Sequence, residues 1–198
     1  MNDLDRTLFL LLNAPSDEWG VLAYAAFVWA KFVIFLIPLH LALLWIAGDR
    51  SVRRQSLILL TALLVAIGIS YGLGVAYPTD RPFVTPLGHA LMSHRASPSF
   101  PSNHGLIFFT YAATMGMLRH WSYAFAIGAG GLVVAWSRIY LGVHFPLDMV
   151  GAAVVAVLAA LIAMRLDRRF GRDATNLAED LYEAFALRPL RRAIARLR

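Results

Sequence analysis

SRIYLGVHFPLD, residues 137–148, is the stretch that decides how this chain folds. It separates two apolar segments, residues 123–136 and 149–164, each close to the length of a membrane-spanning helix. Ionisable residues beside such segments are expensive in a bilayer and are usually functional. The stretch therefore predicts a turn between two spans that holds chemistry-bearing side chains at one membrane face.

Two further polar stretches stand beside apolar segments. Arg81 and Pro82 follow the apolar residues 57–76, and the sequence PSNH at residues 101–104 precedes the apolar residues 105–118. Guanidinium groups bind phosphate oxygens in a fork, and histidines serve as nucleophiles or acids. Together these stretches indicate phosphoryl chemistry.

The composition is that of an integral membrane protein. The chain has 198 residues, of which 59% are hydrophobic and only 15% are charged, and its mean hydropathy is +0.62. It has no cysteine, which excludes disulfides and thiolate metal sites. We expect no metal site and no cofactor, because the sequence also lacks an acidic cluster suited to Mg²⁺.

The basic residues behind the net charge of +6 lie where they can contact lipid. Arginines cluster at residues 50–54, 165–172 and 188–198, where they flank apolar segments. Such clusters are topology signals and contacts to anionic lipid, so we expect membrane lipids as partners and no nucleic acid.

Apolar segments divide the chain into an all-α membrane bundle. We predict about five transmembrane helices, a short interfacial helix near residues 8–12, a basic loop at residues 48–54 and a long polar loop at residues 77–103. The spans are expected near residues 21–46, 57–76, 105–118, 123–136 and 149–164.

The predicted membrane domain covers residues 1–165, with a core at residues 55–165. Residues 166–198 are predicted to be a basic amphipathic cytoplasmic tail, broken or kinked at Pro189. Whether residues 1–18 cross the membrane is left open, as is the oligomeric state.

Basic loops normally face the cytoplasm. Applied to the three arginine clusters and Arg119, this rule puts the C-terminus inside and the N-terminus outside. The same topology brings all three polar stretches to the outer face, although they lie far apart in sequence.

His144 and Asp148 are the predicted reactive pair. If Asp148 opens the last span, His144 lies about one turn before it, and the carboxylate can hold one imidazole nitrogen while the other attacks phosphorus. The alternative is an aspartate that caps the helix beside an interfacial histidine.

The other two stretches supply candidates for binding phosphate. Backbone N–H groups at a helix start favour phosphate, Ser102 adds a hydroxyl, and His104 is placed to protonate a leaving oxygen. Arg81 is a candidate clamp for phosphate oxygens. The alternatives are a Ser/Asn helix cap and an arginine that only anchors its helix at the interface.

Taken together, the three stretches resemble the type-2 phosphatidic acid phosphatase superfamily. Its signature is Lys-x6-Arg-Pro, then Pro-Ser-Gly-His, then Ser-Arg-x5-His-x3-Asp. The third part matches in full at residues 137–148, the second reads PSNH, and the first keeps Arg81 and Pro82 but has Gly74 in place of lysine. The likeness covers about residues 55–165.

A narrower likeness is to bacterial undecaprenyl-diphosphate phosphatases of the bacitracin-resistance type. It rests on RPF at residues 81–83, GHAL at 88–91, His94, SFPSNH at 99–104 and LFLLLN at 8–13. Members of that subgroup commonly lack the lysine and have a polar residue at the position of Asn103. Lys31, the only lysine, is a candidate substitute, against the alternative that it only reaches for the interface.

The resemblance implies a membrane lipid phosphatase that turns undecaprenyl diphosphate into undecaprenyl phosphate and phosphate without a metal. His144 would be the nucleophile, Asp148 its orienter and His104 the acid. The implied site faces the periplasm or exterior of a bacterial inner (plasma) membrane. The residues implied to bind substrate are Arg81, Pro82, Ser102, Asn103, Ser137 and Arg138, with His89 and His94 as further candidates or as plain loop residues.

Three alternatives remain at this point. The substrate could instead be phosphatidylglycerol phosphate, phosphatidate or a lipid A phosphate. A lipid acceptor could replace water, which would make the protein a lipid-to-lipid phosphotransferase. The third alternative is a catalytically silent membrane scaffold.

Overall fold

The computed structural model describes residues 3–85, 87–189 and 191. All regular structure in these ranges is helical, which confirms the predicted all-α class. The elements in chain order are α1 (Asp3–Leu12), α2 (Val21–Lys31), the 3₁₀ turn η1 (Val33–Phe35), α3 (Leu36–Ala47), α4 (Arg50–Ala76), α5 (Asn103–Met117), α6 (Trp121–Tyr140), α7 (Pro146–Tyr182) and the π-helical turn η2 (Glu183–Leu187).

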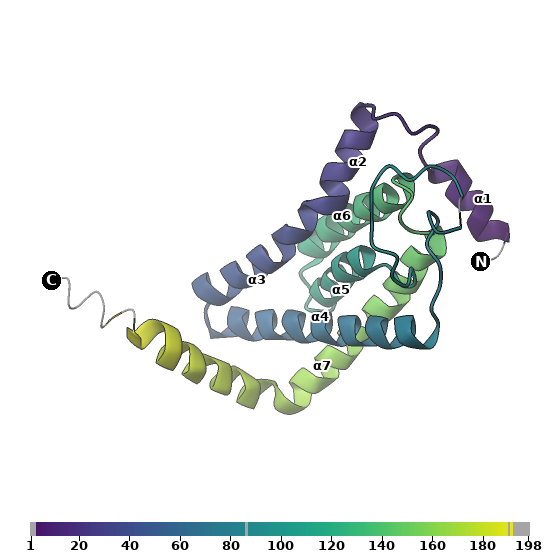
Figure 1. Ribbon diagram of the computed structural model, residues 1–198. Coiled ribbons are helices and arrows are strands. Elements are labelled where there is room, and N and C mark those ends of the chain that lie inside the picture. The colour runs from purple at the N-terminus through teal and green to yellow at the C-terminus, as the bar shows by residue number, and fades with distance from the viewer. Residues whose placement is uncertain (1–2, 86, 190, 192–198) are drawn as a thin grey trace.

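The helices form a membrane bundle (Figure 1). In the described part of the chain, four stretches are long and apolar enough to cross a bilayer: Val21–Ala47, Arg50–Ala76, Trp121–Tyr140 and Pro146–Leu187. The remaining predicted span, residues 105–118, corresponds to α5, whose 15 residues reach about 22 Å at 1.5 Å per residue. It packs against α4, α6 and α7, so neighbouring helices cover most of its surface.

The first span is broken in the middle. α2 and α3 are joined by η1, and Pro38 stands in the first turn of α3. Proline has no N–H to donate to the carbonyl of Ile34, so a regular helix cannot continue through this point. The span therefore consists of two short helices set at an angle (Figure 1).

Small residues bring α7 close to its neighbours. Ala152, Ala156 and Ala159 are fully buried and pack in one cluster with Ala66 of α4 and Leu106 of α5. Small side chains allow helix backbones to approach closely, which is how membrane helices gain packing energy. This contact aligns the ends of α4, α5 and α7.

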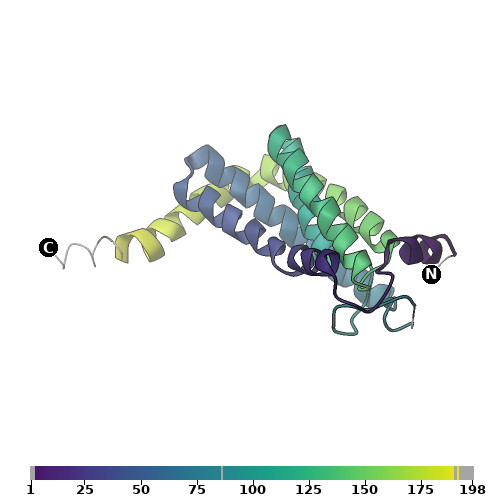
Figure 2. The same ribbon diagram turned by 90° about the horizontal axis from the view of Figure 1, so that it is seen from above.

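The two ends of the bundle differ in what they carry. α1 and the long segment between α4 and α5 lie at one end, and the end of α7 lies at the other (Figure 2). α4 ends, α5 begins, α6 ends and α7 begins at the first of these ends, which we call the site end. The chain thereby brings all three polar stretches together.

The short helix expected near residues 8–12 is present as α1. Phe9 is fully buried, and its ring lies 5.2 Å from that of Phe145. Asp5 accepts a hydrogen bond of 2.9 Å from the backbone N–H of Leu147, in the first turn of α7. Burial raises the pKa of Asp5. α1 is thus fixed to the start of α7.

Two details of the sequence analysis differ from the structure. The loop predicted at residues 48–54 is wrong, because α4 already begins at Arg50: Asp49 caps it by accepting a 2.9 Å bond from Val52 N–H. The last helix is also longer than the span predicted at residues 149–164, because α7 continues without interruption to Tyr182.

The end of the chain is distorted before Pro189. η2 is a π-helical turn, and Pro189 follows it in helical conformation. Residues 190 and 192–198 lie outside the described residues. The division into residues 1–165 and 166–198 stays a prediction.

Candidate active site

Side chains from four places in the chain meet at the site end. Arg81 comes from the segment after α4, Arg138 from the last turn of α6, His144 from the turn between α6 and α7, and Asp148 from the first turn of α7. His104, in the first turn of α5, feels the charges of Arg138, His144, His94 and Arg81. The predicted convergence is therefore present in the structure.

His144 and Asp148 form a buried pair. Nδ1 of His144 lies 3.1 Å from Oδ2 of Asp148, and both residues are less than 5% exposed. The same carboxylate oxygen accepts a 2.9 Å bond from the backbone N–H of Phe145. Asp148 thus caps α7 and holds the imidazole at once, so the two interpretations from the sequence are compatible.

The turn before His144 depends on Gly142. Its φ of 77° lies in the left-handed region, and a Cβ there would collide with the backbone of His89. Glycine is the residue that adopts this conformation without strain. The turn reverses the chain after α6 and delivers His144 beside Asp148.

The contacts of His144 define its tautomer. The carboxylate of Asp148 accepts, so Nδ1 carries the proton. Nε2 lies 3.1 Å from Nη1 of Arg81, and a guanidinium can only donate, so Nε2 presents its lone pair. Burial lowers the pKa of His144 to about 4, against the opposite effect of Asp148. The imidazole is neutral near pH 7, as a nucleophile requires.

Arg81 is buried and saturated with hydrogen bonds. All five of its N–H groups have acceptors: Nε donates to Ser97 O at 2.9 Å, Nη1 to Val143 O and to His144 Nε2 at 3.1 Å each, and Nη2 to Ser97 Oγ and Pro98 O at 3.2 Å each. None of these acceptors is a carboxylate. Burial lowers the pKa of Arg81, yet a guanidinium stays charged. Its hydrogen-bond partners are therefore all neutral, while the nearby carboxylate of Asp148 favours its charge without a direct bond.

Arg138 is the least satisfied group of the site. It is 2% exposed, and Nη1 makes a long bond of 3.5 Å to the carbonyl of Ala30. Nε and Nη2 are buried without a hydrogen-bond partner among the described residues. An unmet buried donor costs about 1–3 kcal/mol, and more when it is charged. Two such donors on one guanidinium define a site for an oxyanion.

Ser102 and Asn103 both lie at the start of α5. Ser102 is fully buried and its hydroxyl caps the helix, accepting from Gly105 N–H at 3.5 Å. The side chain of Asn103 accepts a 2.9 Å bond from the Ser70 hydroxyl of α4. Both residues border His104.

The other residues predicted to bind substrate lie deeper. The hydroxyl of Ser137 donates within α6 to Val133 O at 2.8 Å, and Pro82 is buried beside Arg81. Their roles in binding substrate stay predictions.

The two loop histidines have different places. The ring of His94 lies 6.4 Å from that of His144, and its Nδ1–H donates to the carbonyl of Arg95. His89 instead pairs with Asp17 at 3.0 Å, where both side chains are exposed. The structure brings only His94 to the reactive pair.

Lys31 lies at the end of α2, in the broken first span. Its ammonium faces two aromatic rings, at 5.0 Å from the centroid of Phe27 and 5.7 Å from that of Phe32. Cation–π contacts of this kind stabilise a charged ammonium in an otherwise apolar span. Its substitution for the missing lysine stays a prediction.

The position of that lysine lies in an open groove. Gly74 borders a cavity of about 340 Å³ between α4 and residues 95–103. Its polar lining includes Arg95, Ser70 and Asn103, and its apolar lining includes Ile67, Tyr71, Val75 and Pro98. The groove adjoins the site through Ser97, which also binds Arg81.

Sequence reasoning missed two residues that hold the site together. Asn13 was noted only as part of a likeness, yet its side chain binds His89 N–H at 2.6 Å, His89 O at 2.9 Å and Tyr140 O at 3.0 Å. Asp5 supports the start of α7. The sequence offered one signal for Asn13, namely a polar residue at the end of a short apolar segment.

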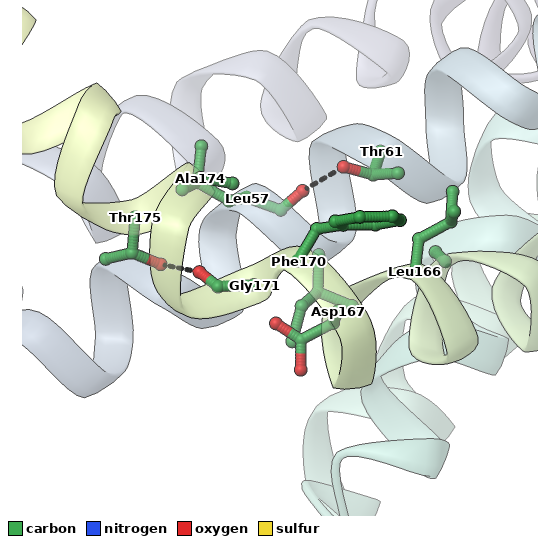
Figure 3. Close-up of a pocket in the computed structure, with 10 residues that line it drawn as sticks. Leu57, Thr61, Leu166, Asp167, Phe170, Gly171, Ala174 and Thr175 are labelled. Carbon is green, nitrogen blue, oxygen red and sulfur yellow. Dashed lines mark hydrogen bonds between the residues drawn. The ribbon is translucent and has the colours of Figure 1, made fainter.

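A separate cavity of about 240 Å³ lies between the other halves of α4 and α7 (Figure 3). Leu57, Phe170 and Asp167 line it, and the hydroxyls near it bond within their own helices. It contains none of the predicted site residues. Among the described residues, no group of three or more His, Cys, Asp or Glu side chains is placed to hold a metal.

Comparison with known proteins identifies the family. Residues 55–172 match the PAP2 superfamily. The chain is 34% identical to YbjG of Escherichia coli (strain K12), whose name contains the term undecaprenyl-diphosphatase, over 99% of both chains. It is 27% identical to the undecaprenyl-diphosphatase BcrC of Bacillus subtilis (strain 168), over 91% of this chain and 93% of the relative.

A solved structure shows the same fold. LpxE of Aquifex aeolicus superposes with a TM-score of 0.67 at 22% identity, covering 83% of this chain and 96% of that one. The resemblance inferred from the three polar stretches is confirmed. This chain therefore belongs to the PAP2 superfamily and is a multi-pass membrane phosphatase.

Proposed function

We propose that this lipid phosphatase hydrolyses undecaprenyl diphosphate to undecaprenyl phosphate and inorganic phosphate through a phosphohistidine at His144. The observation that carries the proposal is the buried guanidinium of Arg138, which has two unmet donors in the cluster that contains the neutral His144. The names of the relatives support the choice of lipid.

The first step is attack of the His144 Nε2 lone pair on the terminal phosphorus. The P–N bond forms as the anhydride P–O bond breaks, and His104, which becomes protonated when the negatively charged diphosphate binds beside it, gives its proton to the leaving oxygen of undecaprenyl phosphate. Asp148 stabilises the charge that develops on the imidazole through the Nδ1 proton. Arg138 and Arg81 bind the equatorial oxygens, where transition-state charge accumulates.

The second step returns the enzyme to its starting state. His104, now neutral, takes a proton from water as the water oxygen attacks the phosphoryl group. The P–N bond breaks, its electron pair returns to Nε2 and inorganic phosphate leaves. His104 is protonated again for the next turnover, so protons balance over the cycle.

The groove between α4 and residues 95–103 supports a lipid substrate. Tyr71 and Val75 are exposed on its α4 side, where a prenyl chain can stay in the bilayer. Arg95, Ser97 and Asn103 line its polar side next to the catalytic cluster. The distribution of arginines supports a site on the outer face of a bacterial inner membrane.

The test is phosphate release from undecaprenyl diphosphate by protein purified in detergent. Phosphatidylglycerol phosphate, phosphatidate and a lipid A phosphate serve as competing substrates, and His144→Ala as the inactive control. We expect preference for the diphosphate, with a loss of about 10³-fold or more in the variant. An acid-labile, base-stable phosphoryl group on the wild-type protein would identify the intermediate.

Other outcomes separate the alternatives. Preference for a monophosphate would overturn the substrate and keep the mechanism. Label transferred from lipid to lipid, with no free phosphate, would replace hydrolysis by phosphotransfer. Substantial activity in His144→Ala would overturn the nucleophile, and loss of activity in EDTA would overturn a metal-free reaction.

A further inference from the structure

Ser99 lies in contact with both members of the reactive pair, outside the three parts of the family signature. It is fully buried. Its hydroxyl donates to Oδ2 of Asp148 at 2.5 Å and lies 3.3 Å from Nδ1 of His144. The three polar groups therefore form a closed triangle.

The main chain at Ser99 is held without this hydroxyl. The backbone N–H of Ser99 donates to Thr79 O at 2.9 Å, and the next N–H, of Phe100, donates to the Thr79 hydroxyl at 3.0 Å. The path of the segment before α5 is fixed by these bonds. The hydroxyl of Ser99 is thus not needed to hold the loop and bonds to the carboxylate of Asp148 instead.

One oxygen of Asp148 accepts all the bonds that orient the pair. Oδ2 accepts from Ser99 Oγ, from Phe145 N–H and from Nδ1–H of His144. The N–H of Phe145 fixes the carboxylate from the side of α7, and Ser99 fixes it from the segment before α5. Because these two donors come from separate elements, they fix the orientation of the carboxylate, and Oδ2 faces Nδ1 of the imidazole.

We propose that Ser99 is a positioning residue that locks the Asp148 carboxylate onto Nδ1 of His144 and so keeps Nε2 unprotonated and aimed at phosphorus. The inference rests on the proposed histidine nucleophile. Ser99 touches no reacting atom, and its effect reaches the substrate through Asp148 and His144.

The lock matters most when the imidazole becomes cationic. Phosphorylation of Nε2 puts positive charge on the ring, and the carboxylate stabilises it only while Oδ2 stays in line with Nδ1. Without the serine hydroxyl, Asp148 keeps the helix cap to Phe145 but loses its second tether. Misaligned carboxylates beside a catalytic histidine reduce turnover more than substrate binding.

Ser99→Ala tests this in phosphate release from undecaprenyl diphosphate. We expect kcat to fall about 10-fold to 100-fold and KM to change less than about 2-fold. Ser99→Thr, which keeps the hydroxyl, should recover most of the loss. The matched control is Ser56→Ala, which should keep wild-type kcat. Ser56 is a buried serine at the end of α4 away from the site, and its hydroxyl bonds to Arg53 O and to no other of the described residues.

The pH profile separates positioning from mere packing. Because Asp148 raises the pKa of His144, a carboxylate that loses its alignment with Nδ1 favours the protonated imidazole less, so the acid limb of kcat/KM should move to lower pH in Ser99→Ala. The limb should stay in place in Ser56→Ala. The charged and titratable groups around His144 that set this limb are Asp148, Arg81, Arg138, His94, His104 and Asp5.

Two results would overturn the inference. One is a Ser99→Ala enzyme with kcat within about 2-fold of wild type. The other is a loss of kcat with an unmoved acid limb in both alanine and threonine variants, which would make Ser99 a packing residue. The His144→Ala control keeps the two proposals apart, because an active His144→Ala would sink the nucleophile itself whatever Ser99 does.

Discussion

The arginines at the two ends of the bundle have opposite surroundings. At the site end, Arg81 and Arg138 are buried, and the hydrogen bonds of both go to neutral acceptors. At the other end, Arg54 forms a 2.8 Å pair with Asp167, and Arg53 lies 3.6 Å from Glu179. Among the described residues, the two guanidiniums at the site end therefore bond only to neutral groups, whereas these two at the other end pair with carboxylates.

The difference shows how to tell a functional arginine from an anchoring one in a membrane protein. A half-exposed arginine paired with a carboxylate joins two helices, here α4 and α7, and needs nothing further. A buried guanidinium with unmet donors lowers the stability of the protein, and a bound anion can supply the missing hydrogen-bond acceptors. Three variants and one pH profile test this distinction, from the largest expected effect to the smallest.

Arg138→Met should cost the most activity at little cost in stability. We expect kcat/KM to fall by about 10²–10³-fold, because the transition-state charge loses a direct donor. The thermal midpoint in detergent should stay equal or rise, because the variant removes a buried charge that lacks partners. A large fall in the midpoint with activity intact would contradict the assignment.

Added phosphate gives that variant a readout besides activity. Inorganic phosphate should raise the midpoint of the wild type by mass action, and by less in Arg138→Met. Equal stabilisation of both proteins would place the anion elsewhere.

The pH dependence of the wild type should reflect the buried histidine. Because burial lowers the pKa of His144 to about 4, its neutral form survives as pH falls through the usual histidine range near 6.5 and is lost only near pH 4. The acid limb of kcat/KM assigned to the enzyme should therefore lie well below pH 6.5. The substrate phosphate titrates as well, so its pKa is measured separately by ³¹P NMR and its contribution is removed from the profile. An acid limb at the ordinary histidine value would be evidence of an exposed nucleophile.

Arg95→Ala addresses the missing lysine. Arg95 and Gly74 border the same groove, whereas Lys31 faces two aromatic rings in the first span. We expect Arg95→Ala to raise KM for the diphosphate about 3-fold to 10-fold with kcat nearly unchanged. Loss of a contact that is equally strong in the bound substrate and in the transition state has this effect. Lys31→Met is the matched comparison, and a larger rise in KM there would return the role to Lys31.

Arg54→Met should have the smallest effect and no effect on catalysis. The pair with Asp167 is partly exposed, so its loss should lower stability by about 0.5–1 kcal/mol. Activity within about 2-fold of wild type is expected from steady-state assays. A loss comparable to that of Arg138→Met would remove the contrast between the two ends.

Much of this arrangement was accessible from the sequence. Hydropathy and the positions of arginines predicted the spans and the common end of the three polar stretches, because helices of similar length must alternate direction across a bilayer. The pairing of His144 with Asp148 followed from one helical turn of spacing.

What escaped prediction depends on backbone outside regular helices. Arg81 binds carbonyls of residues 97, 98 and 143, and no side-chain pattern reports where a carbonyl points. The hydroxyl of Ser99 meets Asp148 for the same reason, since the segment before α5 has no periodicity to place it. The error at residues 48–54 was different, because Asp49 was a visible cap signal that the arginine cluster outweighed.

The saturation of Arg81 has a consequence for the end of each catalytic cycle. A guanidinium with five acceptors of its own gives up some of them when it takes hold of a phosphoryl oxygen, and regains them when the product departs. The protein's carbonyls thus compete with the product for the same donors. In the proposed mechanism this competition favours release of inorganic phosphate, so we expect accumulated phosphate to inhibit the enzyme only weakly.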